Sequence, residues 1–180
     1  MKPAKVRSIV VPILVSLGVG ACGGQSDGAD AGAAFEPAVP PADPCALLSA
    51  DDVATILPDA DSGYPDFNDD TCSSTRWCTY FSTGSLAHFS VYVRGMFNET
   101  LWREAERGFR QTWGEGNVAG IGDHAHFFPD GGEPGDTPFA GTALVVYAQP
   151  YRVTTQAVDT PVQTQEALVA IVRKVLPELL

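Results

Sequence analysis

Two histidines near the middle of the chain have a spacing that could hold a metal ion. His124 and His126 follow Asp123 in the segment GDHAHF. On a β-strand, residues i and i+2 point the same way, so both imidazoles could contact one ion. A third ligand could come from His88 only if the fold brought the two strands together. The apolar neighbours of the pair are typical of a half-buried strand, and we therefore expect no metal site.

A second group of possible metal ligands is the acidic segment 58–70, which carries five aspartates. Calcium prefers oxygen ligands, and an EF-hand loop arranges them over about 12 residues. With Asp66 as the first ligand, Thr71 would stand where the loop needs glycine, and Trp77 where it needs a bidentate glutamate. The pattern fails, and we interpret the segment as a solvated acidic loop.

Signals for catalysis are equally weak. The chain contains no H-E-x-x-H zinc-binding pair and no P-loop. Glu104 and Glu106 are two residues apart on a predicted helix, so their carboxylates do not face each other. Cys72 could be a reactive thiol, but Arg76 is the one basic residue near it in sequence that could stabilise a thiolate. We predict no catalytic residue, no cofactor and no enzymatic activity.

Cys22 has the most specific context of any residue in the chain. It follows a basic start and an apolar run over residues 9–19. This run is shorter than the roughly 20 residues that span a membrane, and it fits a secretory signal, which takes about 7–15. The sequence VGAC at residues 19–22 resembles the lipobox of bacterial lipoproteins, whose cysteine becomes the acylated N-terminus. We predict a signal peptide over residues 1–21 and lipidation at Cys22, with plain secretion and an uncleaved anchor as alternatives.

This anchor determines where the protein works and what it can bind. The acyl chains of a mature lipoprotein hold it stably, so we expect an extracytoplasmic protein on the cell membrane or the outer membrane. Removing the signal takes away three of the 11 basic residues and none of the 22 acidic ones, which leaves a formal charge of −14. Nucleic acid is excluded as a partner, because it requires clustered Lys and Arg.

The mature chain divides into a tether and one domain. Residues 22–43 are rich in Gly, Ala, Asp and Pro, and such a segment buries too little apolar surface to offset its chain entropy. We predict a disordered tether there. Residues 44–180 have a normal length for a single domain with one hydrophobic core.

Sequence patterns predict helices at both ends of this domain and strands between them. Ser49 and Asp52 form a capping-box pair, Asn98 is a plausible N-cap, and Thr160 with Pro161 suits the start of a last helix. Apolar alternation predicts strands at 76–82, 85–95, the end of 117–128, 142–149 and 151–158. We expect an α+β fold in which an antiparallel sheet of about five strands packs with N-terminal and C-terminal helices.

Three cysteines remain if Cys22 is acylated, namely Cys45, Cys72 and Cys78. Disulfides persist outside the cytosol, so we expect one bridge and one leftover thiol. A Cys45–Cys78 bridge would close a loop of about 33 residues and stabilise the fold by roughly 3–4 kcal/mol in the chain-entropy model. A Cys72–Cys78 bridge would close a short loop and contribute less. Both pairings stay open on these grounds, as do three unpaired thiols.

Several short segments carry a family resemblance. DPCALLSADDVATIL, a WCTY strand start, VAGIGDHAHF and LVVYA, followed by a C-terminal helix, resemble a family of lipid-anchored exported proteins of unknown function typical of high-GC Gram-positive bacteria. The similarity runs over most of residues 44–180. In that family the cysteine after Asp-Pro and the one before the aromatic strand are paired, which implies a Cys45–Cys78 disulfide here. Cys72 departs from the pattern, and the resemblance implies no chemistry.

These observations favour a lipid-anchored, noncatalytic binding module of the cell envelope. Its partner would be an envelope protein, a lipid or a polymer. The alternative function is an envelope hydrolase or a metal-handling protein. Aromatic side chains are the positive support, because they commonly line ligand pockets. Trp113 and Phe128 are the predicted rim of a concave apolar patch between sheet and helix, because they stand on opposite sides of the turn over residues 116–122.

Overall fold

The computed structural model describes residues 35–70, 72–129 and 141–180. The predicted signal peptide, Cys22 and most of the predicted tether lie outside these residues. The elements are, in chain order, the 3₁₀ helix η1 (Pro44–Leu47), α1 (Ala50–Ala54), β1 (Tyr64–Asp69), β2 (Ser73–Phe81), β3 (His88–Met96), α2 (Glu99–Trp113), β4 (His124–Phe128), β5 (Thr142–Ala148), β6 (Tyr151–Val158), α3 (Gln165–Val175) and the 3₁₀ helix η2 (Leu176–Glu178).

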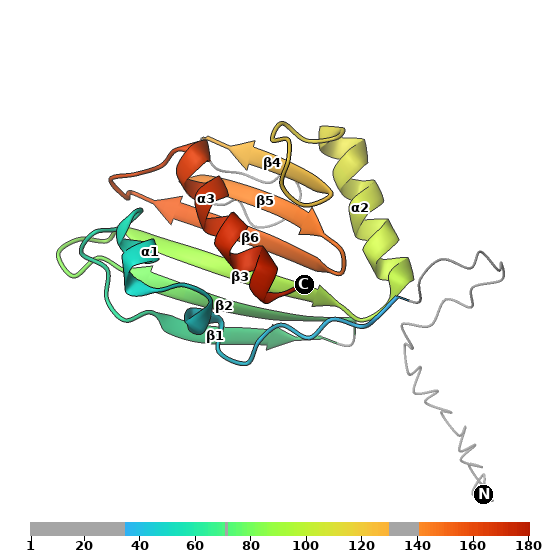
Figure 1. Ribbon diagram of the computed structural model, residues 1–180, viewed down its shortest axis with the longest axis horizontal. Coiled ribbons are helices and arrows are strands. Elements are labelled where there is room, and N and C mark those ends of the chain that lie inside the picture. The colour runs from blue at the N-terminus through green and yellow to red at the C-terminus, as the bar shows by residue number, and fades with distance from the viewer. Residues whose placement is uncertain (1–34, 71, 130–140) are drawn as a thin grey trace, which may run out of the picture.

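The strands form one antiparallel sheet of six strands in the order β1-β2-β3-β6-β5-β4 (Figure 1). The fold is α+β, as predicted. We expected about five strands, and the additional one is β1, which lies in the segment interpreted as an acidic loop. All six residues of β1 are exposed, so the segment has no apolar alternation that could reveal a strand. Backbone pairing with β2 over its whole length holds it in the sheet.

The larger core lies between the sheet and the two helices α1 and α3, which cover the same face (Figure 1). Alternate residues of β3 point into it, and α3 supplies an apolar stripe at helical spacing. Burial of this surface contributes roughly 25 cal/mol per Å². Its fully buried side chains include Val53, Ile56, Phe89, Val91, Val93, Leu144, Val146, Leu168, Ile171, Val172 and Val175.

A smaller core lies on the opposite face, beneath α2. Strand β5 is buried along its whole length, because its side chains alternate between the two cores. Leu144 and Val146 belong to the larger core, whereas Val145 and Tyr147 belong to the smaller one. Helix α2 adds apolar side chains from one of its faces, so the sheet is covered on both sides where β5 and β4 lie.

Capping signals in the sequence set where the first two helices begin. The Ser49 hydroxyl accepts a hydrogen bond from the Asp52 backbone N–H, and the Asp52 carboxylate accepts one from the Ser49 backbone N–H. Asn98 caps α2 in a similar way, because its side-chain oxygen accepts from the Leu101 backbone N–H at 2.9 Å. Such caps typically contribute about 1 kcal/mol each. Both predicted starts are confirmed.

The predicted start of the last helix is wrong. Helix α3 begins at Gln165, and Thr164 is its N-cap, accepting from the Ala167 backbone N–H. Thr160 is buried, and its hydroxyl donates to the Val162 carbonyl two residues on. This local hydrogen bond holds the chain in a turn, and the helix begins only after Thr164, four residues beyond the expected cap. Threonine side chains form such turns as well as helix N-caps.

A disulfide joins η1 to β2 through Cys45 and Cys78. The two Cα atoms are 5.0 Å apart, and the residues are 33 apart in sequence. The implied pairing is thus confirmed, and the bridge fastens the start of the domain to the sheet. Cys72 is disulfide-bonded as well, and none of the cysteines in the described residues is free. The expectation of a leftover thiol, which came from an odd count of three, is wrong for Cys72.

The N-terminal part of the described chain follows the sheet before η1 begins. We expected the tether to reach residue 43, but residues 35–43 contact the domain. Ala38 is buried, and its backbone N–H donates to the Met96 carbonyl at 3.0 Å. A side chain at Gly95 would collide with the Ala38 carbonyl, so glycine permits this close approach. None of the helices in the described residues is long and apolar enough to cross a membrane.

Candidate functional site

Helix α2 places one face against the sheet and leaves the other free for contacts with solvent. Trp102 and Phe109, seven residues apart, are almost fully buried, which is two turns of an α-helix. Phe109 packs against Tyr147 of β5 with a ring-centroid distance of 5.0 Å. The residues on the opposite side of the helix therefore point outward, and among these are three arginines.

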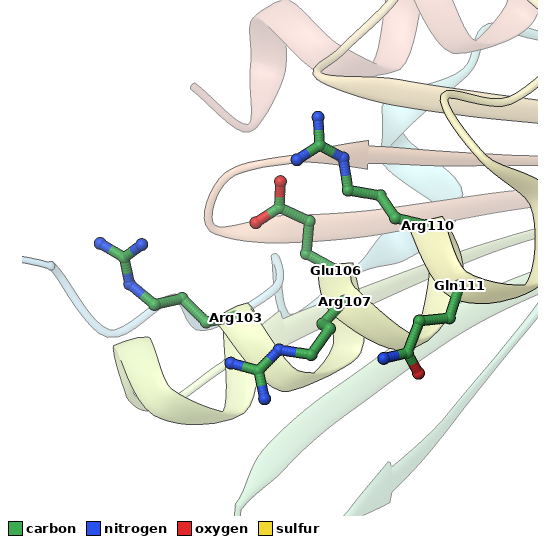
Figure 2. A pocket seen from close by; sticks show the side chains of 5 residues that line it. All are labelled: Arg103, Glu106, Arg107, Arg110 and Gln111. Carbon is green, nitrogen blue, oxygen red and sulfur yellow. The ribbon is translucent and has the colours of Figure 1, made fainter.

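The outward face of α2 forms a hollow of about 370 Å³. Figure 2 shows its five lining side chains, which all project from the same helix. The arginines stand at i, i+4 and i+7, a spacing that places side chains on one helix face. The lining residues are Arg103, Glu106, Arg107, Arg110 and Gln111.

The three arginines differ in how they are held. Arg103 pairs with Glu99 one turn earlier, with Nε 2.8 Å from the Glu99 carboxylate. Arg110 reaches past the end of the helix and donates to both carboxylate oxygens of Glu115, at 2.8 and 3.0 Å. Arg107 has neither an ion pair nor a hydrogen bond from its side chain within the described residues. The hollow therefore combines two paired guanidinium groups with an exposed one that has no partner among the described residues.

The charge of this hollow contrasts with that of the whole protein. Three arginines and one glutamate give its lining a formal charge of +2, whereas the chain carries −11. Two of these arginines are paired with Glu99 and Glu115, which lie outside the lining. Guanidinium groups bind carboxylates and phosphates through charge-assisted and often bidentate hydrogen bonds. The acidic remainder of the surface repels anions. This face of α2 is therefore suited to holding an anionic group.

Glu106 connects the hollow to a buried histidine. His124 of β4 is 7% exposed, and its Nε2 lies 2.9 Å from the Glu106 carboxylate. Its other ring nitrogen, Nδ1, lies 3.2 Å from Glu115, although the alignment of the pair does not meet hydrogen-bond geometry. The bond to Arg110, with a smaller contribution from His124, holds the pKa of Glu115 below its ordinary value. Glu115 likewise raises the pKa of Arg110.

The two residues predicted as a pocket rim do meet in the structure. The rings of Trp113 and Phe128 pack edge to face with centroids 5.3 Å apart, and His126 lies against both. Phe128 is 7% exposed and belongs to the smaller core, while Trp113 is partly buried against it. They fill the space between α2 and β4, whereas the hollow is on the outer side of the helix. Their role in binding stays a prediction.

The fold separates the residues considered as metal ligands. His88 is on β3, and β6 and β5 lie between it and the histidines of β4. The two ring nitrogens of His124 face different glutamates, so these carboxylates do not converge on one ion. Within the described ranges, no group of three or more His, Cys, Asp or Glu side chains could hold a metal ion.

The acidic segment also serves local structure. Asp61 accepts hydrogen bonds from two backbone N–H groups, those of Gly63 and Phe81. Asp69 at the end of β1 pairs with Arg76 of β2, and this bond holds the pKa of the Asp69 carboxyl below its ordinary value. These carboxylates bind groups close to themselves and do not point toward a common centre.

Sequence reasoning missed the arginine hollow, although a signal for it was present. The predicted helix after Asn98 contains the arginines at intervals of four and three residues, and this alone places them on one face. The apolar residues of the same helix mark the opposite face. The contact between Glu106 and His124, by contrast, could not be predicted, because it joins two elements 18 residues apart in sequence.

Comparisons with known proteins do not identify this site. No family model, no curated protein and no solved structure matches the chain. The family resemblance of residues 44–180 therefore stays a prediction.

Proposed function

We propose that this protein is a noncatalytic, lipid-anchored binding module of the cell envelope, which holds anionic groups of an envelope polymer in the arginine hollow on α2. The observation that carries the proposal is that Arg103, Arg107 and Arg110 line one hollow of an acidic protein. The predicted lipid at Cys22 would keep this hollow close to the membrane surface, at the cell membrane or the outer membrane.

The way in which the three arginines are paired supports a binding role. Arg107 can offer all of its donors to a ligand without first breaking an ion pair. Arg103 is 67% exposed and Arg110 48% exposed, and exposed ion pairs contribute at most about 1 kcal/mol. An anionic ligand could therefore recruit both of them at little cost. Phosphate and carboxylate groups share the required chemistry, and a polymer presents many copies of either.

Binding of model polyanions tests the proposal. We expect the full chain, in detergent, to bind inorganic polyphosphate in isothermal titration calorimetry, with an affinity that falls as salt is raised. Arg107→Gln should weaken binding about tenfold, because hydrogen bonds to charged groups contribute roughly 1.5–3 kcal/mol. Repeating the titration with poly-L-glutamate distinguishes a phosphate-bearing polymer from a carboxylate-bearing one.

Arg173 of α3 provides a matched control. It is exposed and lies on a helix that covers the opposite face of the sheet. Arg173→Gln changes the net charge by the same amount as Arg107→Gln and should leave binding unchanged. Equal losses in both variants, or no binding of either polyanion by the wild type, would show that the hollow is not a binding site.

The anchor is tested separately. Cys22→Ala should move the protein from the detergent phase to the aqueous phase and block processing of the signal peptide. The lipid would occupy the sulfur of Cys22, so the assignment requires that the disulfide partner of Cys72 be a cysteine other than Cys22. Mass spectrometry of the native protein should then find Cys22 in a lipid-bearing N-terminal peptide. Wild-type partitioning of the variant, or Cys22 found in a disulfide, would contradict the assignment.

A further inference from the structure

Two of the residues that line the hollow belong to a chain of charged groups centred on His124. Glu106 is within hydrogen-bond distance of one ring nitrogen, and Glu115 lies 3.2 Å from the other. Glu115 is also the partner of Arg110. A change in the charge of His124 would therefore act on the hollow through both Glu106 and Arg110.

We propose that His124 makes anion binding in the hollow dependent on pH, so that protonation of its imidazole strengthens the binding of phosphate or carboxylate groups. The proposal rests on the function proposed above and assigns a regulation to the same site. Its basis is geometric, because the ring nitrogens of one buried histidine face two carboxylates, of which Glu106 lines the hollow and Glu115 pairs with the lining residue Arg110.

The two protonation states of the ring fit this arrangement differently. A neutral imidazole has one N–H donor and one bare nitrogen, whereas the imidazolium has two donors. Both nitrogens face carboxylates, so only the charged form places an N–H toward Glu106 and another toward Glu115. In the neutral form one carboxylate faces a lone pair instead.

The surrounding groups determine what the added charge does. Glu106 faces His124 from α2, and Glu115, which is paired with Arg110, faces it from the turn after that helix. His126 lies on the same strand, and Tyr147 is the pairing partner of His124 on β5. Among the residues that the structure describes, no carboxylate contacts His126, and burial lowers its pKa. The imidazolium of His124 would offset the negative charge of Glu106 in the hollow. It would also compete for Glu115, which releases Arg110 toward a ligand.

The coupling must also run in the other direction. If protonation of His124 tightens anion binding by some factor, a bound anion tightens proton binding by the same factor. This reciprocity supplies a second measurement that needs no variant.

The test compares polyphosphate binding at about pH 8 and about pH 5.5 in the full chain. Internal phosphates of this probe keep their charge over that range, so a long polyphosphate changes charge only at its two ends. We expect binding about fivefold tighter at the lower pH, at the low end of typical allosteric coupling. His124→Gln should bind with the same affinity at both pH values. His126→Gln, the matched control two residues along β4, should keep the pH dependence of the wild type.

Nuclear magnetic resonance of the wild type keeps the proposal testable if His124→Gln does not fold. Saturating polyphosphate should raise the titration midpoint of the His124 ring by about 0.7 pH unit, which corresponds to the fivefold coupling. Binding without this shift, or with the same pH dependence in His124→Gln, would overturn the regulation and leave the proposed function intact. Absence of binding at both pH values would overturn both.

Discussion

The two faces of the sheet differ in what holds them together. The face under α1 and α3 carries the larger core, built from aliphatic side chains and fastened by the Cys45–Cys78 disulfide. The face under α2 has a smaller core rich in aromatic rings, bordered by His124, Glu106 and Glu115. Apolar packing does not depend on pH or salt to the extent that ion pairs do. The first face therefore supplies stability, and the second supplies groups that can respond to a ligand.

The largest expected change in stability comes from removing the disulfide on the face under α1 and α3. A Cys45→Ala, Cys78→Ala double variant should lose roughly 3–4 kcal/mol of unfolding free energy in the chain-entropy model, because the bridge spans 33 residues. Urea denaturation measures this loss. Chemical reduction of the wild type is not an equivalent control, because Cys72 is also disulfide-bonded.

Peptide mapping without reduction checks the pairing behind that prediction. It should yield a linked peptide containing Cys45 and Cys78, and it identifies the residue bonded to Cys72. A small change in stability in the double variant would show that the larger core holds the fold without its disulfide. The contrast between the two faces would then rest on packing alone.

The smallest expected change in stability comes from His126 on the face under α2, and it depends on pH. Burial lowers the pKa of His126 from 6.5, so below about pH 6.5 the unfolded chain binds more protons at this residue than the folded one. Stability must therefore fall as the pH drops through this range. His126→Gln should reduce the fall between about pH 6.5 and pH 5, measured by thermal unfolding. The effect should be well below that of the double cysteine variant, because His126 is only partly buried.

The larger core offers the comparison for that measurement. Phe89→Leu alters the first face without removing a titratable group and should shift the unfolding midpoint equally at every pH in the range. An unchanged pH dependence in His126→Gln would assign the acid sensitivity to other groups and weaken the view that the α2 face is the responsive one.

Most of the secondary structure could be predicted because its signals are local. The capping box at Ser49 and the cap at Asn98 act within three residues, and apolar alternation marks five of the strands. Strand β1 was not predicted because all of its residues are exposed. Helix α3 begins later than predicted because Thr160 forms a hydrogen bond within its own turn. The pairing of β1 with β2 and the hydrogen bond of the Thr160 hydroxyl decide these two outcomes, and neither produces a periodic pattern in the sequence.

The sequence by itself determined most of the elements, the acidic charge and the placing of Arg103, Arg107 and Arg110 on one helix face. Charge follows from composition, and the other two depend on residues close together in the chain. Tertiary structure alone decided that Phe128 is packed beneath α2 and that His124 lies between Glu106 and Glu115. These outcomes depend on which strands become neighbours and which face a helix covers. Such long-range choices follow from the packing of the whole domain and from the chain entropy of closing long loops, which no short segment encodes.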